Sequence, residues 1–206
     1  MEGKGESITV ATTRPETIFA DVAIAVSPHD KRYKKLIGKK VLIPIINKSI
    51  PIIADAAVDM TFGTGALKVT PTHDPVDFDI GQRNNLPLDN YAIDKKGLFT
   101  QLAGPNYAGR HIDQAYEGFM QELEEIGNIE KTEKHIHKVP FCERSGTRIQ
   151  PMLSRQWFID VAEPAQKTIE ALDDNSVQVH PERFVDQFKH WLGNIQPWCI
   201  SRQLWR

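Results

Sequence analysis

The first seventy residues contain five short apolar segments, each separated from the next by residues that favour turns. The segments are residues 7–13, 22–26, 41–46, 50–54 and 66–70. Short, evenly spaced segments of this kind are typical of the strands of a β-barrel and less typical of a doubly wound sheet. We therefore predict a fold of mixed β with α class, built on a closed or nearly closed β-barrel.

Three helices are predicted between and after these strands. Residues 27–38 begin with a Ser-Pro pair typical of a helix start and end at a glycine. A second Asp-Pro start predicts a helix over residues 74–85. The strongest helical pattern covers residues 109–126, where apolar side chains recur every three or four positions.

The pattern changes in the last third of the chain. A strand is predicted at residues 135–139, and after a proline-rich connection two helices follow at residues 163–172 and 181–192. We therefore predict a β-rich domain at residues 1–150 and a mostly helical segment at residues 151–206.

Charge and composition restrict the classes of partner. The net charge is −2, so no overall positive field attracts nucleic acid, and any contact with RNA must be local. The two cysteines do not suggest a disulfide framework, and no apolar stretch is long enough to span a membrane. The first six residues do not resemble a signal peptide, so we expect a soluble, cytoplasmic protein.

Two segments concentrate polar and ionisable side chains at the ends of predicted strands, namely TTRPET at residues 12–17 and FGTGALKVTPTHDPVD at residues 62–77. Strand ends and helix starts present backbone N–H groups and well-held side chains to a ligand. This set suits a small zwitterionic ligand with a polar group of its own, and it suits an apolar ligand poorly. Its ionisable members include Arg14, Lys68, Asp74 and Asp77.

Each of these residues also has an ordinary structural explanation. Lys68 and Thr70 alternate with apolar neighbours in a predicted strand, so they face away from the core and could simply meet solvent. Asp74 stands at a helix N-cap, and Asp77 in the first turn complements the helix dipole. Arg14 precedes a proline, which holds its backbone extended, and its side chain either meets solvent or donates to a ligand.

Two histidine patterns are weaker signals. His73 adjoins Asp74, but adjacent residues seldom face each other, so a backbone contact or a purine contact fits His73 better than the role of general base. His135 and His137 with Cys142 resemble part of a zinc site, yet no Cys-x-x-Cys pair exists. We expect no metal site.

Taken together, the two polar segments carry a family resemblance. TTRPET, followed some fifty residues later by FGTGALKVTP-x-HDP-x-D, resembles the editing domain inserted into the valyl-tRNA synthetases, which are class I aminoacyl-tRNA synthetases. The segments PFCERSG, SRQWF and WCISRQLW further along the chain resemble the return of that insertion to the catalytic core. The isoleucyl and leucyl enzymes share the general plan, but their second motif differs after the proline.

The resemblance implies a β-barrel editing domain decorated with helices, with a helical C-terminal appendage that leads back to the catalytic core. The implied activity is that of an aminoacyl-tRNA deacylase, which hydrolyses threonyl ester wrongly attached to the 3′-terminal adenosine of tRNA(Val). The alternatives are a non-catalytic module that binds the tRNA acceptor end and a structural insertion. The implied partners are that acceptor end and the parent catalytic domain, with no membrane, and we expect a monomer.

The resemblance also assigns residues. The implied catalytic set is Asp77, Lys68 and Thr70, with Asp77 binding the α-amino group of the substrate. The implied substrate-binding set is Thr12, Thr13, Arg14, Thr17, Phe62, Gly65, His73 and Asp74. No cofactor is expected, because ATP and Mg²⁺ serve the catalytic domain, whose signature segments this chain lacks. Two residues depart from the family pattern: Thr72 replaces a common Ala, and Arg206 replaces a second Trp.

Overall fold

The computed structural model describes residues 7–203. The predictions that concern residues 1–6 and residues 204–206, at the ends of the chain, fall outside this range. The chain divides into two compact units, Met1–Leu153 and Ser154–Arg206, which we call the N-terminal unit and the C-terminal unit.

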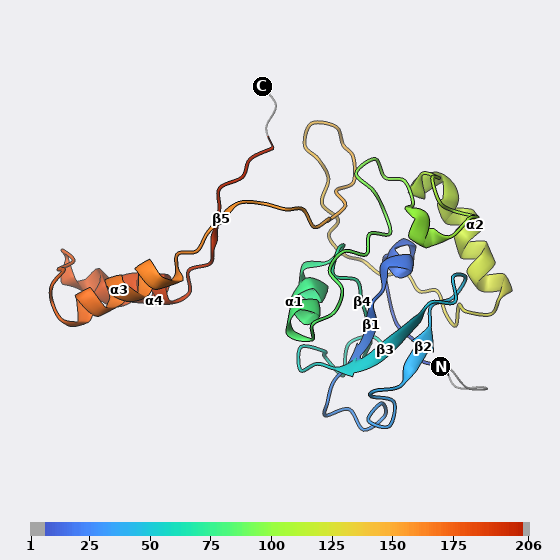
Figure 1. The fold of residues 1–206 in the computed structure, drawn as a ribbon, viewed down its shortest axis with the longest axis horizontal. Helices are drawn as coiled ribbons and strands as arrows, with labels where there is room; N and C mark the ends of the chain where they lie inside the picture. The colour runs from blue at the N-terminus through green and yellow to red at the C-terminus, as the bar shows by residue number, and fades with distance from the viewer. Residues whose placement is uncertain (1–6, 204–206) are drawn as a thin grey trace. The chain divides into compact units, whose positions relative to one another are not determined.

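The N-terminal unit contains a four-stranded sheet in the order β2-β3-β1-β4 (Figure 1). Its strands are β1 (Ala23–Val26), β2 (Lys40–Leu42), β3 (Ser49–Ala54) and β4 (Ala66–Val69). Strand β1 pairs in parallel with β3 and antiparallel with β4, and all four of its residues are buried. A strand that is covered on both faces needs apolar side chains on both, which explains the unbroken apolar run in the sequence.

The predicted closed or nearly closed barrel is not confirmed, because in the described residues the sheet is open. Strands β2 and β4 are its two edges, and they do not pair with each other. Residues 7–13 do not form the predicted strand, and residues 93–111 contribute only the isolated bridges Ile93–Phe99 and Leu98–His111. Without these extra ladders no strand is available to join the two edges.

Two other local predictions are also wrong. Residues 27–38 form consecutive turns in place of the predicted helix. The Asp30 carboxylate accepts a hydrogen bond from the backbone N–H of Arg32 at 2.9 Å, and this local bond competes with helix formation. Residues 135–139 lie outside any strand, because in the described chain no partner strand pairs with them.

The two helices predicted for the N-terminal unit are confirmed as α1 (Pro75–Arg83) and α2 (Ile112–Glu125). Figure 1 shows α1 beside β4 and β1, with α2 away from it across the sheet. Helix α2 buries Phe119 and three other apolar residues against the short helices η1 (Pro15–Ala20) and η2 (Gln101–Ala103). This packing fixes η1, whose first three residues end the TTRPET segment, beside the sheet.

The C-terminal unit has its own small core. Helices α3 (Ala162–Asp173) and α4 (Val185–Gly193) pack through Ala165, Leu172 and Leu192, as the two predicted helices require. The short helix η3 (Glu182–Phe184) precedes α4, and the strands β5 (Phe158–Ile159) and β6 (Trp198–Cys199) pair antiparallel. Within residues 7–203, none of the helices has both the length and the apolar character that a membrane crossing requires.

Candidate functional site

A buried polar cluster lies where β4 ends and α1 begins. The antiparallel register of β1 with β4 places Asp21, just ahead of β1, beside Thr70, just after β4. The backbone N–H of Val22 donates to the carbonyl of Val69 at 2.9 Å and continues the ladder to this point. Helix η1 closes the cluster with Thr17, so that three separate segments of the chain contribute to it.

The ammonium group of Lys68 lies at the centre of this cluster and is buried. It donates hydrogen bonds to the hydroxyls of Thr70 at 2.6 Å and Thr17 at 2.7 Å, and to the Asp21 carboxylate at 3.2 Å. An ammonium group has three protons, so all of them are used within the protein. The alternative in which Lys68 simply meets solvent therefore does not hold, because η1 covers that face of β4.

Asp21 is the principal residue of the cluster that the sequence analysis missed. Its Oδ1 atom also accepts a hydrogen bond from the Thr70 hydroxyl at 2.5 Å, whereas its Oδ2 atom accepts none from residues 7–203. Burial raises the pKa of Asp21, while the charge of Lys68 and the Thr70 hydrogen bond oppose the rise. The available signal was an acidic residue placed directly before the apolar run of residues 22–26.

Asp77 contributes the second buried carboxylate. Its Oδ2 atom accepts the backbone N–H of Thr70 at 2.8 Å, which is its one hydrogen bond through the side chain within the described chain. Burial raises the pKa of Asp77 to about 6, and the nearby charge of Asp74 adds to the rise. The carboxylate is thus ionised at neutral pH, and its Oδ1 atom remains available to a donor.

Arg14 connects η1 to two other parts of the N-terminal unit. Its guanidinium donates to the carbonyl of His73 at 2.9 Å and to the side-chain oxygen of Gln150. Its Nε atom lies 3.5 Å from the Oε1 atom of Glu16, which is buried without a hydrogen bond from residues 7–203. Thr12 accepts the backbone N–H of Arg14 at 3.0 Å and so orders the approach to η1.

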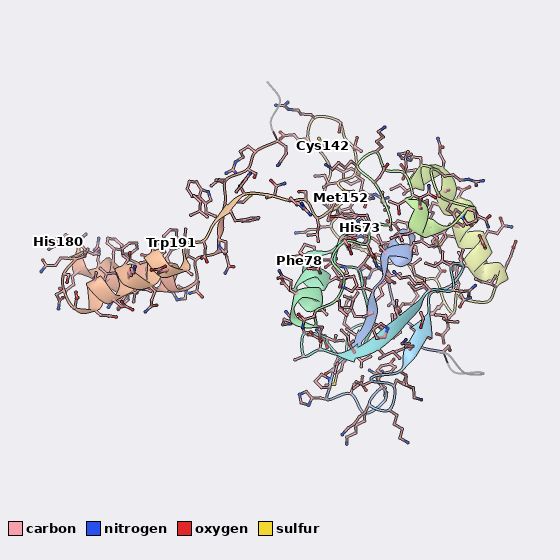
Figure 2. The ribbon with its side chains drawn as sticks, viewed as in Figure 1. His73, Phe78, Cys142, Met152, His180 and Trp191 are labelled. Atoms are coloured by element: carbon pink, nitrogen blue, oxygen red, sulfur yellow. The ribbon has the colours of Figure 1, made fainter. Side chains whose placement is uncertain are left out.

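Residues 150–153 pack against the loop that precedes α1, a contact that the sequence analysis did not predict. The His73 ring donates through Nδ1 to the carbonyl of Pro151 at 3.2 Å, and Figure 2 shows His73 beside Met152. The backbone N–H of Leu153 donates to the carbonyl of Thr72 at 3.0 Å. The Thr72 hydroxyl donates to the carbonyl of Asn90, so this departure from the family pattern serves the loop's structure.

His73 is held as a neutral ring. Its Nε2 atom accepts the backbone N–H of Ala92 at 3.0 Å, so that both ring nitrogens are bonded to backbone groups. Burial lowers the pKa of His73 to about 4. Neither ring nitrogen is available as a general base or as a contact to a purine.

We expect the His73 ring not to titrate between pH 5.5 and 8. Because the unfolded chain binds this proton near pH 6.5 and the folded chain only near pH 4, the free energy of unfolding falls as pH is lowered through this window. NMR of the ring protons, assigned by their loss in His73→Asn, measures the first effect. A titration midpoint near 6.5 would show that the ring is not held neutral.

The remaining predicted residues lie outside the hydrogen-bonded cluster. Asp74 is exposed and caps α1 by accepting the backbone N–H groups of Val76 and Asp77 at 2.8 and 3.2 Å. Thr13 is exposed, and Phe62 is 70% exposed. Gly65 precedes the opposite end of β4, and with φ of +77° a side chain there would collide with the guanidinium of Arg32.

Metal binding has no support in the described residues. Within residues 7–203 no group of three or more His, Cys, Asp or Glu side chains is placed to hold a metal ion. The rings of His135 and His137 stack on each other with centroids 5.6 Å apart, and both residues are exposed.

Comparison with known proteins identifies related sequences. A family model described as tRNA synthetases class I (I, L, M and V) matches residues 7–206. The chain is 48% identical over all 206 residues to valine–tRNA ligase of Streptococcus pyogenes serotype M28, and 46% identical over 199 residues to that of Chlorobaculum tepidum. It is 46% identical over 205 residues to valine–tRNA ligase of Dehalococcoides mccartyi. The chain covers 22–23% of the length of these curated relatives.

Proposed function

Because the chain belongs to the class I tRNA synthetases (I, L, M and V) and corresponds to a segment of the valine–tRNA ligases, we propose that it is their editing segment. Its proposed reaction is hydrolysis of threonyl ester from mischarged tRNA(Val). Valine and threonine have the same shape, and an apolar pocket cannot strongly reject an isostere that adds a hydroxyl. A second, polar site is the physical remedy, and the buried cluster around Lys68 is polar.

The balance of charge in the cluster is the observation that carries this proposal. Asp21 and Asp77 are two buried carboxylates, and among residues 7–203 Lys68 is the one buried ammonium that faces them. The charges of Asp21 and Lys68 both act on Asp77. One uncompensated negative charge in a buried site is complementary to one cation, and the α-ammonium of an aminoacyl ester is such a group. We assign that contact to the Oδ1 atom of Asp77.

Recognition of the threonine hydroxyl is assigned to Asp21 and Thr70. Since Lys68 already donates all three of its protons, it acts by holding these acceptors in place. The Oδ2 atom of Asp21 accepts no hydrogen bond from residues 7–203 and suits a substrate hydroxyl. A valine side chain would leave such a buried acceptor without a partner, which costs about 1–3 kcal/mol.

The proposed chemical step is the addition of water to the ester carbonyl. The bond between the carbonyl carbon and the ribose oxygen breaks, the ribose oxygen takes one proton of the water, the other proton passes to solvent, and threonine leaves as its carboxylate. An ester is already activated, so a positioned water and stabilisation of the developing oxyanion are sufficient. We assign no general base, because both nitrogens of His73 are engaged.

We expect the chain to hydrolyse threonyl-tRNA(Val) faster than valyl-tRNA(Val), by about 5- to 150-fold if one unsatisfied acceptor of about 1–3 kcal/mol separates the two esters. Release of radiolabelled amino acid from the two charged tRNAs measures the ratio. Equal rates of hydrolysis for the two esters would contradict the proposed specificity for threonine. Binding of tRNA without hydrolysis of either ester would favour the non-catalytic acceptor-end module, and absence of both would favour a structural insertion.

The C-terminal unit is proposed to pack against the catalytic domain of the parent enzyme. Within the described residues of this unit, five aromatic side chains are exposed: Trp157, Phe158, Phe184, Trp191 and Trp198. Exposed apolar side chains gathered in so small a unit commonly mark an interaction surface. The relatives are about four times as long as this chain, so they contain further polypeptide that is able to cover it.

A further inference from the structure

Positive charge is concentrated in one part of the N-terminal unit. Residues 28–54 contain seven Lys or Arg residues and one acidic residue, Asp30, although the whole chain has a net charge of −2. The rest of the chain is therefore strongly acidic. So uneven a distribution creates a local positive potential that the net charge conceals.

In the turns of residues 27–38, the apolar side chains face the sheet and the basic side chains face solvent. Tyr33, Leu36 and Ile37 pack against the apolar cluster of the sheet. The lysines between them remain exposed, as does the lysine that begins the edge strand β2. We call this set the basic surface: Lys31, Lys34, Lys35 and Lys40.

Hydrogen bonds hold the backbone that carries the basic surface. Arg32 binds both carboxylate oxygens of Asp30, with the shortest contact at 2.6 Å, and donates to the carbonyl of Met60 at 3.0 Å. The Tyr33 hydroxyl donates to the carbonyl of Thr64 at 2.8 Å. These bonds tie the turns to the loop before β4, so the lysines are presented by an ordered backbone.

No acidic side chain of the described residues neutralises the basic surface. Asp30, the one acidic residue in this stretch, is engaged by Arg32, whose hydrogen bonds hold the pKa of Asp30 below its usual range. Within residues 7–203, none of the four lysines forms an ion pair. Four uncompensated ammonium groups on one ordered surface fit a partner with regularly spaced negative charge.

We infer that the basic surface binds the phosphate backbone of an RNA, and that this RNA is the tRNA whose aminoacylated end enters the site. The inference rests on the proposed function for the identity of the RNA. The four-residue strand β1, about 13 Å long, leads from Asp21 of the cluster to the turns that carry Lys31, Lys34 and Lys35. Phosphates only a few nucleotides from the 3′ end would therefore lie within reach of the lysines.

The test is the salt dependence of tRNA binding to the 206-residue chain. Fluorescence anisotropy of a labelled tRNA(Val) transcript, recorded from 50 to 200 mM KCl, gives the slope of log K against log salt. A triple variant, Lys31→Gln with Lys34→Gln and Lys35→Gln, is compared with a control that changes charge equally elsewhere. The control variant combines Lys95→Gln, Lys96→Gln and Lys134→Gln, which are also exposed.

Each phosphate contact contributes about 0.7–0.9 to the slope, so the triple variant is expected to flatten it by about 2–3. Over the fourfold range of salt, the wild-type chain should lose about 20- to 40-fold more affinity than this variant. The control variant should follow the wild type, and the rate of deacylation at saturating tRNA should be unchanged in both.

Several outcomes would overturn the inference: an unchanged slope in the triple variant, an equal change in the control, or no tRNA binding by the wild type at 50 mM KCl. Tighter binding of polyglutamate or of phosphatidylserine vesicles than of tRNA, lost in the triple variant, would assign the surface to another partner. A flattened slope in a chain that hydrolyses neither ester would support the surface and contradict the proposed function.

Discussion

Asp77→Asn is expected to slow deacylation by at least about 30-fold while the chain remains folded. The change keeps an oxygen that can accept the N–H of Thr70, but it removes the charge that we assign to the substrate ammonium. Leaving a buried charge without its partner costs about 2–5 kcal/mol, which corresponds to a loss of about 30-fold to several thousand-fold in kcat/KM. Deacylation of threonyl-tRNA(Val) under single-turnover conditions measures this loss.

Asp79→Asn is the matched control for this variant. Asp79 lies on the same helix, two residues further on, and is exposed. The substitution changes charge by the same amount and should leave the rate within twofold. Wild-type turnover by a folded Asp77→Asn chain, or equal losses in the two variants, would contradict the role assigned to Asp77.

Asp77→Asn should also stabilise the folded chain at neutral pH. The pKa of Asp77 is about 6 in the folded chain and near 3.8 when unfolded, so the folded chain holds a proton that the unfolded chain releases between these values. Its stability therefore falls as pH rises from about 4 to 6, by up to about 2–3 kcal/mol. Asn does not ionise and removes this loss. Urea denaturation at pH 8 and pH 4 should show a gain at pH 8 alone.

Lys68→Met is expected to destabilise the N-terminal unit strongly. It removes the counter-charge of the buried Asp21 carboxylate and one hydrogen-bond donor from each of the hydroxyls of Thr17 and Thr70. Breaking a buried ion pair from one side costs about 3–5 kcal/mol, a large share of the 5–15 kcal/mol that stabilises a typical domain. The free energy of unfolding in urea at pH 7.5 measures this cost.

A double variant separates the contribution of the ion pair to stability from the contribution of packing. Adding Asp21→Asn to Lys68→Met removes the orphaned charge, so the two effects should fall short of additivity by about 0.5–3 kcal/mol. Lys95→Met, at an exposed position, serves as the control and should change stability by less than about 0.5 kcal/mol. Full additivity of the two buried substitutions would mean that Lys68 and Asp21 do not depend on each other.

Local sequence signals predicted the elements whose causes are local. Helix α1 begins after Asp74 because its carboxylate accepts two N–H groups of the first turn, and the Asp-Pro pair announces that start. Helix α2 follows its apolar stripe, which Phe119 and its neighbours bury. The strands β1, β3 and β4 coincide with short apolar runs for the same reason. The prediction of a barrel was not confirmed, because closure of a barrel depends on pairing between distant strands, which no local pattern encodes.

The sequence by itself placed Lys68, Thr70 and Asp77 in one short segment. The resemblance to the synthetases marked these three residues as candidate catalytic residues. Tertiary structure alone decided that Lys68 is buried, because the alternation of a strand states which side chains share a face and not what covers that face. It also brought Asp21 to Lys68 across 47 positions and Gln150 to Arg14 across 136. Contacts of such separation arise from how β1, η1 and the segment of residues 150–153 pack, and packing is a property of the whole chain.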